Sequence, residues 1–413
     1  MLDFKPPKDN ALIIGCLKLL WPVVTRLRMR GATLVVEPSD VEKFKKLRGK
    51  RALVCPNHSN RHDPEVMFGF GLAVDEEFNF IAAREVFDYN NGRNGWLLQR
   101  VGTYSVVRGA VDRDSFKTTR DILAHGKKKL VLFPEGEISK QNDFLMPLES
   151  GAAQLSFWAL SDILKENEDE TLHIVPLAVK YTYENDISGA LSSALTDLEH
   201  KLGVKCTTTS LKERVRIVAE KLLDILEKEY RHQSPEGATM NERVDSLRQA
   251  ILQHAAKQLD VELPANQRQL EQVRVVRNAI DDYIYDTEHG DSQYEKKVHD
   301  EMSRTVASCY KDIGRVVNFI AIYDGYLSEH MTQERCADII DRLETEVNGR
   351  EAEPWGPRRI YIRVGDPIDL KSHMDAYRAN KRKAVATVTD EIFSQISSML
   401  EATETERQPV FVK

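Results

Sequence analysis

The stretch that decides the fold is ALVCPNHSNRHDPEVMFGFGLAV, residues 52–74. Its first four residues are apolar, which predicts a short buried strand, and residues 64–74 have the apolar content of a helix. Between these elements lies CPNHSNRHDP, residues 55–64, which is rich in the Asn, Ser, Asp and Pro of tight turns. A buried strand, a polar turn and a helix in succession indicate an α/β domain.

The same alternation continues on both sides of this stretch, from residue 31 to residue 184. Runs rich in β-branched and apolar residues predict strands at residues 32–37, 52–55, 78–82, 103–107, 129–133 and 173–183. Helix-like segments lie between them, at residues 41–47, 64–74, 114–126 and 151–160. We therefore predict, over residues 31–184, an α/β domain whose mixed sheet is flanked by helices.

Residues 185–357 have a different pattern. Apolar residues recur there at helical spacing, in residues 211–230, 240–259, 269–284 and 294–323. Two of these segments follow capping-box pairs, Ser210 with Glu213 and Thr239 with Glu242. The apolar spacing does not keep a strict seven-residue register, so a packed all-helical bundle is favoured over a coiled coil.

The end of the chain returns to the first pattern. Residues 359–370, RIYIRVGDPIDL, resemble a strand, and a final helix is expected from about Met374 to Ala402. We assign residues 358–413 to the first domain, as its closing strand and C-terminal helix. Residues 185–357 are then a large helical insertion.

Length and composition exclude several classes of protein. The chain has 413 residues, 41% hydrophobic and 30% charged, which suits two or three globular domains and not a disordered, collagen-like or polytopic membrane protein. Its five cysteines are scattered without CxxC spacing, so neither a disulfide framework nor a zinc site is indicated, and a reducing compartment is expected. The acid-rich helical block lacks the basic stripe that nucleic-acid binding requires.

Residues 1–30 form a separate apolar and basic segment. Its apolar run, ALIIGCLKLLWPVV at residues 11–24, is too short to span a bilayer and is followed by Arg26, Arg28 and Arg30. Residues 1–51 carry a net charge of +7, against −14 for the remainder. We predict that this segment associates with an anionic membrane surface, which would make the protein cytoplasmic and peripheral on the membrane. The alternative is a first helix that packs on the protein's own core.

The polar turn holds the residues best suited to chemistry. If the turn brings Asp63 onto one imidazole nitrogen of His58, the other nitrogen can take a proton from an alcohol. The substrate then supplies the nucleophile, and the sequence has no GxSxG elbow that would supply one instead. His62, next to Asp63, is a rival base that spacing alone does not exclude.

Three further blocks follow NHSNRHDP in the chain: GTYSVVR at residues 102–108, FPEGEIS at residues 133–139, and Val175-Pro176. In this order and spacing the four blocks resemble those of the glycerolipid acyltransferase superfamily, whose best-known members acylate 1-acylglycerol 3-phosphate. The resemblance covers about residues 32–183, and VGDPI at residues 364–368 is similar to the family's closing segment.

The resemblance implies a role for each matched residue. His58 corresponds to the general base that deprotonates the acceptor hydroxyl, and Asp63 to the acid that orients it. Arg108 corresponds to the arginine that helps to hold the acceptor's phosphate. The remaining residues assigned to substrate binding are Glu135 and Gly136 of the acceptor turn, Ser139 and Asn57. The implied donor is acyl-CoA or acyl-carrier protein, with neither a metal nor a cofactor.

This chain departs from the family pattern at two places. The family's Thr-Arg is replaced by Glu137-Ile138, and a lysine that often precedes a Gly-Ala pair is replaced by Glu149. The exchange of two cations for two anions disfavours a phosphomonoester dianion. Arg108 and Lys140 are the cations that remain in these blocks to hold one.

The function predicted from the sequence is therefore transfer of a fatty acyl chain from a thioester donor to a hydroxyl of a lysophospholipid, with 1-acylglycerol 3-phosphate as the leading acceptor, in phospholipid biosynthesis. One alternative is an acyltransferase for another acceptor: glycerol 3-phosphate, another lysolipid or a non-phosphate alcohol. A second is an inactive lipid-binding or scaffold protein. The helical insertion could cover an acyl groove, mediate self-association or contact a carrier protein.

Overall fold

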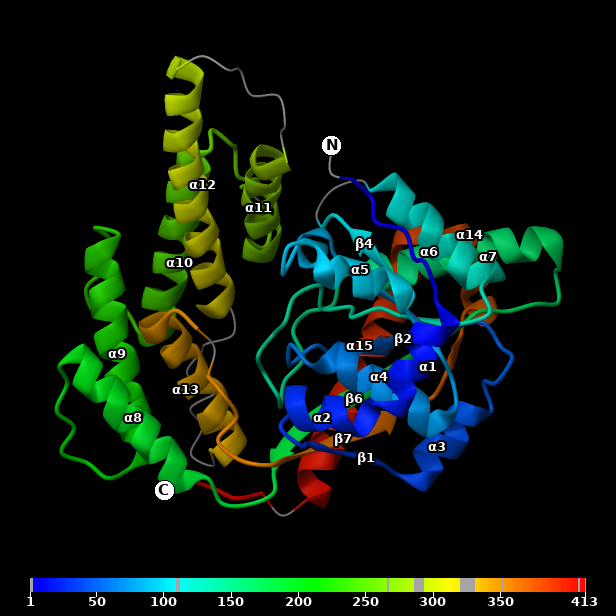
Figure 1. Cartoon of the computed structure of the whole chain (residues 1–413), viewed down its shortest axis with the longest axis horizontal. Helices are drawn as coiled ribbons and strands as arrows, with labels where there is room; N and C mark the ends of the chain where they lie inside the picture. Colours follow the sequence, from blue (N-terminus) through cyan, green and yellow to red (C-terminus); the bar gives the residue numbers. More distant parts are fainter. Residues whose placement is uncertain are drawn as a thin grey trace.

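The computed structural model describes residues 3–108, 112–265, 267–285, 293–319, 331–350, 352–407 and 409–412. Within these ranges the chain forms a sheet of eight strands with helices on both faces, and a further group of helices lies beside it (Figure 1). The mixed α/β fold with an additional helical region, as predicted from the sequence, is confirmed.

The sheet is organised around its longest strand, β6 (His173–Tyr183), which is buried over most of its length. The order across the sheet is β1 (Thr33–Val36), β7 (Arg358–Val364), β6, β2 (Ala52–Pro56), β5 (Lys129–Val131), β3 (Phe78–Ala83) and β4 (Thr103–Val106), and β8 (Ile368–Asp369) pairs with β6. Paired strands are parallel, except that β6 is antiparallel to β7 and β8. The carboxyl ends of β2, β4 and β5 therefore meet at one edge, where ligands of such sheets bind.

The strand that follows the helical block lies inside this sheet. Residues 358–364 of β7 pair with residues 177–183 of β6 on one side and with β1 on the other. The run expected as one strand over residues 359–370 is instead two strands, because the chain bends at Gly365. A Cβ added to Gly365 would lie 2.6 Å from the Gln395 Oε1 and 3.0 Å from the Pro176 carbonyl oxygen, so a larger residue would crowd both neighbours.

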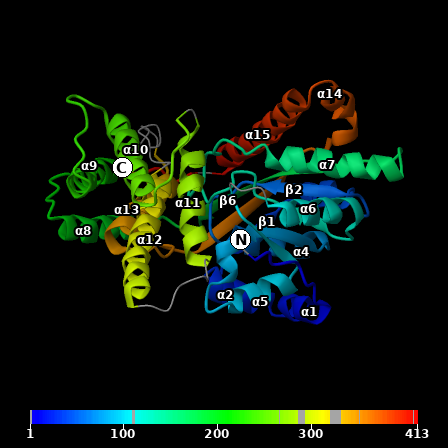
Figure 2. The ribbon, with the colours of Figure 1, turned by 90° about the horizontal axis from the view of Figure 1, so that it is seen from above.

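Alternate side chains of β2 enter different cores, as the two-residue period of a strand requires. Leu53 and Cys55 belong to one core, and Ala52 and Val54 to the other. The first core is covered by α6 (Arg113–His125), α7 (Gly151–Glu166) and α15 (Lys381–Glu406), and the second by α3 (Pro38–Lys45) and α4 (Asp63–Val74) (Figure 2). Burial on both faces is why β2 is a continuous apolar run in the sequence.

The final helix, expected from about Met374 to Ala402, is divided in two. The first part is α14 (Met374–Ala379) and the second is α15. Asn380 separates them because its backbone is extended, with φ −153° and ψ 95°, while its side-chain oxygen accepts a hydrogen bond from the Lys383 N–H. Asn380 is thus the N-cap of α15, a signal that periodicity alone does not reveal.

The helical block comprises α8 (Ser188–Leu202), α9 (Leu211–Glu229), α10 (Met240–Gln258), α11 (Gln269–Tyr285), α12 (Gln293–Phe319) and α13 (Gln333–Asn348). These helices bury their own hydrophobic core. The capping box at Thr239 and Glu242 is complete. At Ser210 only half of the predicted box forms, because the Glu213 carboxylate binds the Thr208 hydroxyl instead. The last four residues of the segment expected at 294–323 lie outside the described ranges.

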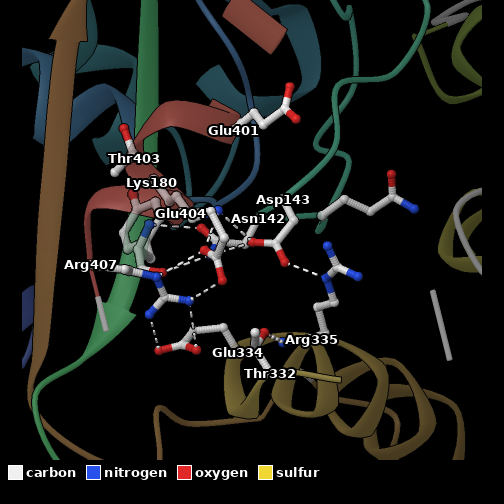
Figure 3. Close-up of polar contacts among 12 residues, drawn as sticks. Asn142, Asp143, Lys180, Thr332, Glu334, Arg335, Glu401, Thr403, Glu404 and Arg407 are labelled. Atoms are coloured by element: carbon white, nitrogen blue, oxygen red, sulfur yellow. Dashed lines mark hydrogen bonds and ion pairs between the residues drawn. The ribbon is translucent and has the colours of Figure 1, made fainter. Parts of the chain in front are cut away.

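Buried ion pairs join the helical block to the sheet (Figure 3). The Lys180 ammonium of β6 lies 2.8 Å from Asp143 Oδ1 and 2.7 Å from Glu404 Oε2 of α15. Asp143 also binds Arg335 of α13, with 2.5 Å between Nε and Oδ2. Arg407 bridges Glu404 to Glu334. The cations and anions balance, which buried charges require.

Lys180→Met should lower the free energy of unfolding by about 3–5 kcal/mol, because it leaves the buried Asp143 and Glu404 carboxylates without their shared cation. Urea-induced unfolding would measure the change. Lys165→Met, at an exposed position of α7, is the matched control and should change the free energy by less than about 0.5 kcal/mol. Equal effects of the two substitutions would contradict a structural role for the buried network.

Candidate active site

The site is built on the turn between the end of β2 and the start of α4. Asp63, the first residue of α4, is fully buried, and its Oδ2 lies 2.9 Å from His58 Nδ1. The same oxygen accepts a hydrogen bond from the Asn60 N–H at 2.8 Å, while Oδ1 accepts one from the Tyr181 hydroxyl at 2.6 Å. Three donors therefore hold the carboxylate in place, and the α4 N-terminus favours its negative charge.

The His58 ring is held on a second side by Phe133. The two rings are stacked, with 4.1 Å between centroids and 22° between planes, and the His58 side chain is only 15% exposed. A carboxylate accepts hydrogen bonds and donates none, so Nδ1 carries the proton in the neutral imidazole. Nε2 is then the basic nitrogen, which is the arrangement of a general base with an orienting acid.

His62 lies in a different environment. It is the N-cap residue of α4, and its Nδ1 is 3.7 Å from Glu65 Oε1. The structure thus pairs Asp63 with His58. The spacing of the residues in the sequence did not show which of the two histidines Asp63 contacts.

Three of the residues predicted to bind substrate hold the backbone of the site. Glu135 is fully buried, and its two oxygens accept hydrogen bonds from the backbone N–H groups of His58, at 2.5 Å, and Met146, at 3.0 Å. Ser139 donates to the His58 carbonyl through its N–H, at 2.8 Å, and its hydroxyl, at 3.1 Å. The Asn57 amide donates to the Val179 carbonyl and accepts from the Val179 N–H, which extends the pairing of β2 with β6.

Arg108 is engaged by carboxylates of the protein itself. Its Nη2 lies 2.5 Å from Glu85 Oε1, and its Nη1 lies 2.7 Å from Glu137 Oε2. Nη1 also donates to the Gly136 carbonyl at 3.0 Å. Burial alone would lower the pKa of Arg108, but the Glu137 and Glu85 carboxylates raise it well above its usual value. Arg108 is thus a permanent cation beside the turn that holds His58.

Sequence reasoning missed three arginines that reach the same turn from the helical block: Arg274 and Arg277 of α11, and Arg268, which directly precedes α11. Arg277 Nη1 is 2.5 Å from Glu137 Oε1. Arg274 Nη1 is 3.1 Å from Glu149 Oε2, and Arg268 Nη2 is 3.2 Å from Glu149 Oε1. The sequence did contain a signal for them, since residues 268, 274 and 277, at or in one predicted helix, are all arginine. Their partners, however, lie more than a hundred residues away in the chain.

Both departures from the family pattern are therefore compensated by α11. Burial alone would raise the pKa of Glu137, but Arg108 and Arg277 lower it, so it is an anion. Lys140, the other cation expected near the acceptor, lies 3.5 Å from Asp341 of α13 through its Nζ. Arg342 of α13 donates to the Ser139 and Lys140 carbonyls at 2.7 and 2.8 Å. The helical block therefore contacts the FPEGEIS turn through two helices.

Burial raises the pKa of Glu135 from 4.5 to about 7. The folded protein then holds this proton over a pH range in which the unfolded chain has lost it, so its stability falls as the pH rises. The quantity to compare is the free energy of unfolding of the wild type minus that of Glu135→Gln. This difference should fall by about 3 kcal/mol between pH 4.5 and 7.5 and then level off. Urea unfolding at several pH values tests this, with Glu168→Gln, at an exposed turn, as the control. A difference that does not change with pH would contradict it.

A comparison with known proteins found a match that covers most of the sheet and the turns described above. Residues 35–180 match the family model described as Acyltransferase. No curated protein matches the chain. The matched residues run from β1 to β6 and include His58, Asp63, Arg108 and the FPEGEIS turn, but they are less than half of the chain. The chain therefore contains a stretch similar to the acyltransferase family, and this supports acyl transfer as its general activity.

Proposed function

We propose that the protein transfers a fatty acyl chain from a thioester, acyl-CoA or acyl-carrier protein, to a hydroxyl of a lysophospholipid, with 1-acylglycerol 3-phosphate as the leading acceptor. The observation that carries the proposal is the contact of His58 Nδ1 with the buried Asp63 carboxylate. This pair lies beside the FPEGEIS turn, which Arg108 and Arg277 contact through Glu137. A base with an orienting acid suits attack by an alcohol on an activated ester.

The reaction needs one proton to move twice. The acceptor hydroxyl gives its proton to His58 Nε2 while its oxygen attacks the thioester carbonyl carbon, and Asp63 stabilises the imidazolium that forms. The tetrahedral intermediate then breaks its carbon–sulfur bond, and the imidazolium returns the proton to the leaving thiolate. The products are the new oxygen ester and the free thiol, and His58 is neutral again.

A second candidate is an acceptor whose headgroup is less charged than a phosphomonoester. The pairing of Arg108 with both Glu85 and Glu137 favours this candidate, because a dianion would have to approach two carboxylates. The inactive scaffold is disfavoured because His58 and Asp63 have the arrangement of a base with its orienting acid.

We also propose that the protein acts on a membrane surface. Helices α1 (Ala11–Leu19) and α2 (Trp21–Arg28) expose the leucines Leu12, Leu19 and Leu27 to between 76% and 81%. Beside them, Trp96 of α5 (Arg93–Arg100) is 52% exposed. Figure 2 shows α1, α2 and α5 along the same edge of the protein. Exposed leucine and tryptophan with neighbouring arginines suit the interface of an anionic bilayer.

The same segment also packs on the protein. Trp21 packs on Phe68 of α4 with 5.0 Å between centroids and 42° between the ring planes, and Ile14 and Met29 are buried. Among the described residues, no helix has both the length and the apolar character needed to cross a bilayer.

His58→Ala should lower acyl transfer by a factor of about 100 to 10,000, because the acceptor hydroxyl loses its base. His62→Ala is the matched control and should retain activity within a few-fold. Release of free thiol from an acyl thioester, measured with lysophosphatidic acid, glycerol 3-phosphate and neutral or zwitterionic lysolipids, is the readout. The reverse pattern would assign the base to His62, and no transfer by the wild type to any acceptor would reject the proposed activity.

Replacing Leu12, Leu19 and Leu27 together by serine should weaken binding to anionic vesicles about ten-fold or more, because less apolar surface enters the bilayer. Sedimentation with vesicles of phosphatidylglycerol and phosphatidylcholine measures the partition. Ile225→Ser, at a partly exposed position of α9 in the helical block, is the control. Unchanged partition of the triple variant, or no weakening with salt, would exclude this surface as the docking site.

A further inference from the structure

Gly136 lies at the centre of a turn that is bonded to His58 on both sides. Glu135 accepts from the His58 N–H, and Ser139 donates to the His58 carbonyl. Gly136 itself has φ +74°, and a Cβ at this position would lie 2.7 Å from Arg274 Nη2. Glycine therefore allows a guanidinium of α11 to pack directly on the turn beside the base.

Two buried guanidinium groups flank this glycine with hydrogen-bond donors to spare. Among the described residues, Arg108 Nε and Arg274 Nε are buried N–H groups without a hydrogen-bond partner. The Arg274 ion pairs use Nη1, which binds Glu149 and Glu271, and the Arg274 side chain is only 9% exposed. A buried donor left without a partner destabilises the folded protein. Two such donors beside one turn point to a ligand that supplies acceptor oxygens.

The four arginines that contact the turn are matched by four glutamates in ion pairs. The cations are Arg108, Arg268, Arg274 and Arg277, and the anions are Glu85, Glu137, Glu149 and Glu271. A guanidinium has five N–H donors, so it can bind a protein carboxylate and a second oxygen at once. In this arrangement Glu85, Glu137 and Glu271 orient Arg108, Arg274 and Arg277. A ligand would then bind to directed N–H groups and not to an excess of positive charge.

We infer that the helical block completes the acceptor site: Arg274 of α11, together with Arg108, binds the phosphate of the acceptor beside His58. This inference rests on the proposed function and deepens it, because it gives the acceptor a phosphate and gives α11 a part in recognising it. Arg277 is a positioning residue, which binds Glu137 and through it Arg108.

The experiment uses two substitutions, each of which removes one partner of the ion pair between Arg274 and Glu149. Arg274→Gln removes the ion pairs of Arg274 with Glu149 and Glu271 together with the proposed phosphate contact. Glu149→Gln removes the ion pairs of Glu149 with Arg274 and Arg268 but keeps the Arg274 guanidinium. Transfer is measured to 1-acylglycerol 3-phosphate and to the corresponding 1-acylglycerol, which lacks the phosphate. Binding of glycerol 3-phosphate by calorimetry gives a readout that does not depend on turnover.

Arg274→Gln should lower kcat/KM for the phosphate-bearing acceptor by about ten-fold or more, mainly through KM. Its effect on the phosphate-free acceptor should be less than about three-fold, and glycerol 3-phosphate should bind about ten-fold more weakly. Glu149→Gln should leave the preference for phosphate within about three-fold of the wild type, because Glu271 still holds the Arg274 guanidinium. Arg274→Lys keeps the positive charge but not the planar guanidinium with its paired donors, so it should recover part of the lost kcat/KM.

The outcomes separate this inference from the proposed function. Equal losses on both acceptors in both variants would mean that Arg274 only docks the helical block, which would overturn the inference and leave acyl transfer intact. Transfer by the wild type to the phosphate-free acceptor alone would overturn the inference and the choice of acceptor, but not the acyltransferase. No transfer by the wild type to any acceptor would overturn the proposed activity and the inference with it.

Discussion

Charged side chains buried between the sheet and the helical block must find their partners inside the protein, and the arrangement of the site depends on this constraint. Lys180 of β6 is almost fully buried and is compensated by Asp143 and Glu404. Asp143 follows the FPEGEIS turn in the chain and also binds Arg335 of the helical block. Breaking this network would leave uncompensated charges in a medium of low polarity, so the turn, the strand and α13 keep one relative position.

The same principle operates on a smaller scale around His58. Glu135 and Ser139 satisfy the backbone N–H and carbonyl of His58, and Asp63 and Phe133 hold its ring. Asn57, the residue before it, bonds to the Val179 backbone of β6. In the proposed reaction, a base held in this way would lose little freedom when substrate binds, which is how preorganisation contributes to a rate. The residues that support the base are thus as much a part of the site as those that meet the substrate.

Much of the fold could be predicted because it follows from local pattern. The strands of residues 31–184 and the long helices at 211–229 and 240–258 were identified from runs and spacings of apolar residues, which report burial directly. The errors occur where one residue changes the path of the chain. Gly365 divides a strand and Asn380 divides a helix, and the physical cause in each case is a contact with a distant part of the chain or a cap of the backbone.

For the site, the sequence by itself determined the chemical groups: a histidine and an aspartate on one turn, an arginine after β4 and a glutamate and a glycine after β5. Only the tertiary structure decided which histidine Asp63 meets, that Glu135 faces backbone N–H groups, and that Glu137 and Glu149 receive arginines from α11. The physical reason is the distance along the chain over which each kind of interaction acts. Burial periodicity and turn preference act between neighbours in the chain, whereas an ion pair joins groups such as Arg277 and Glu137, 140 residues apart, whose meeting depends on how the whole chain packs.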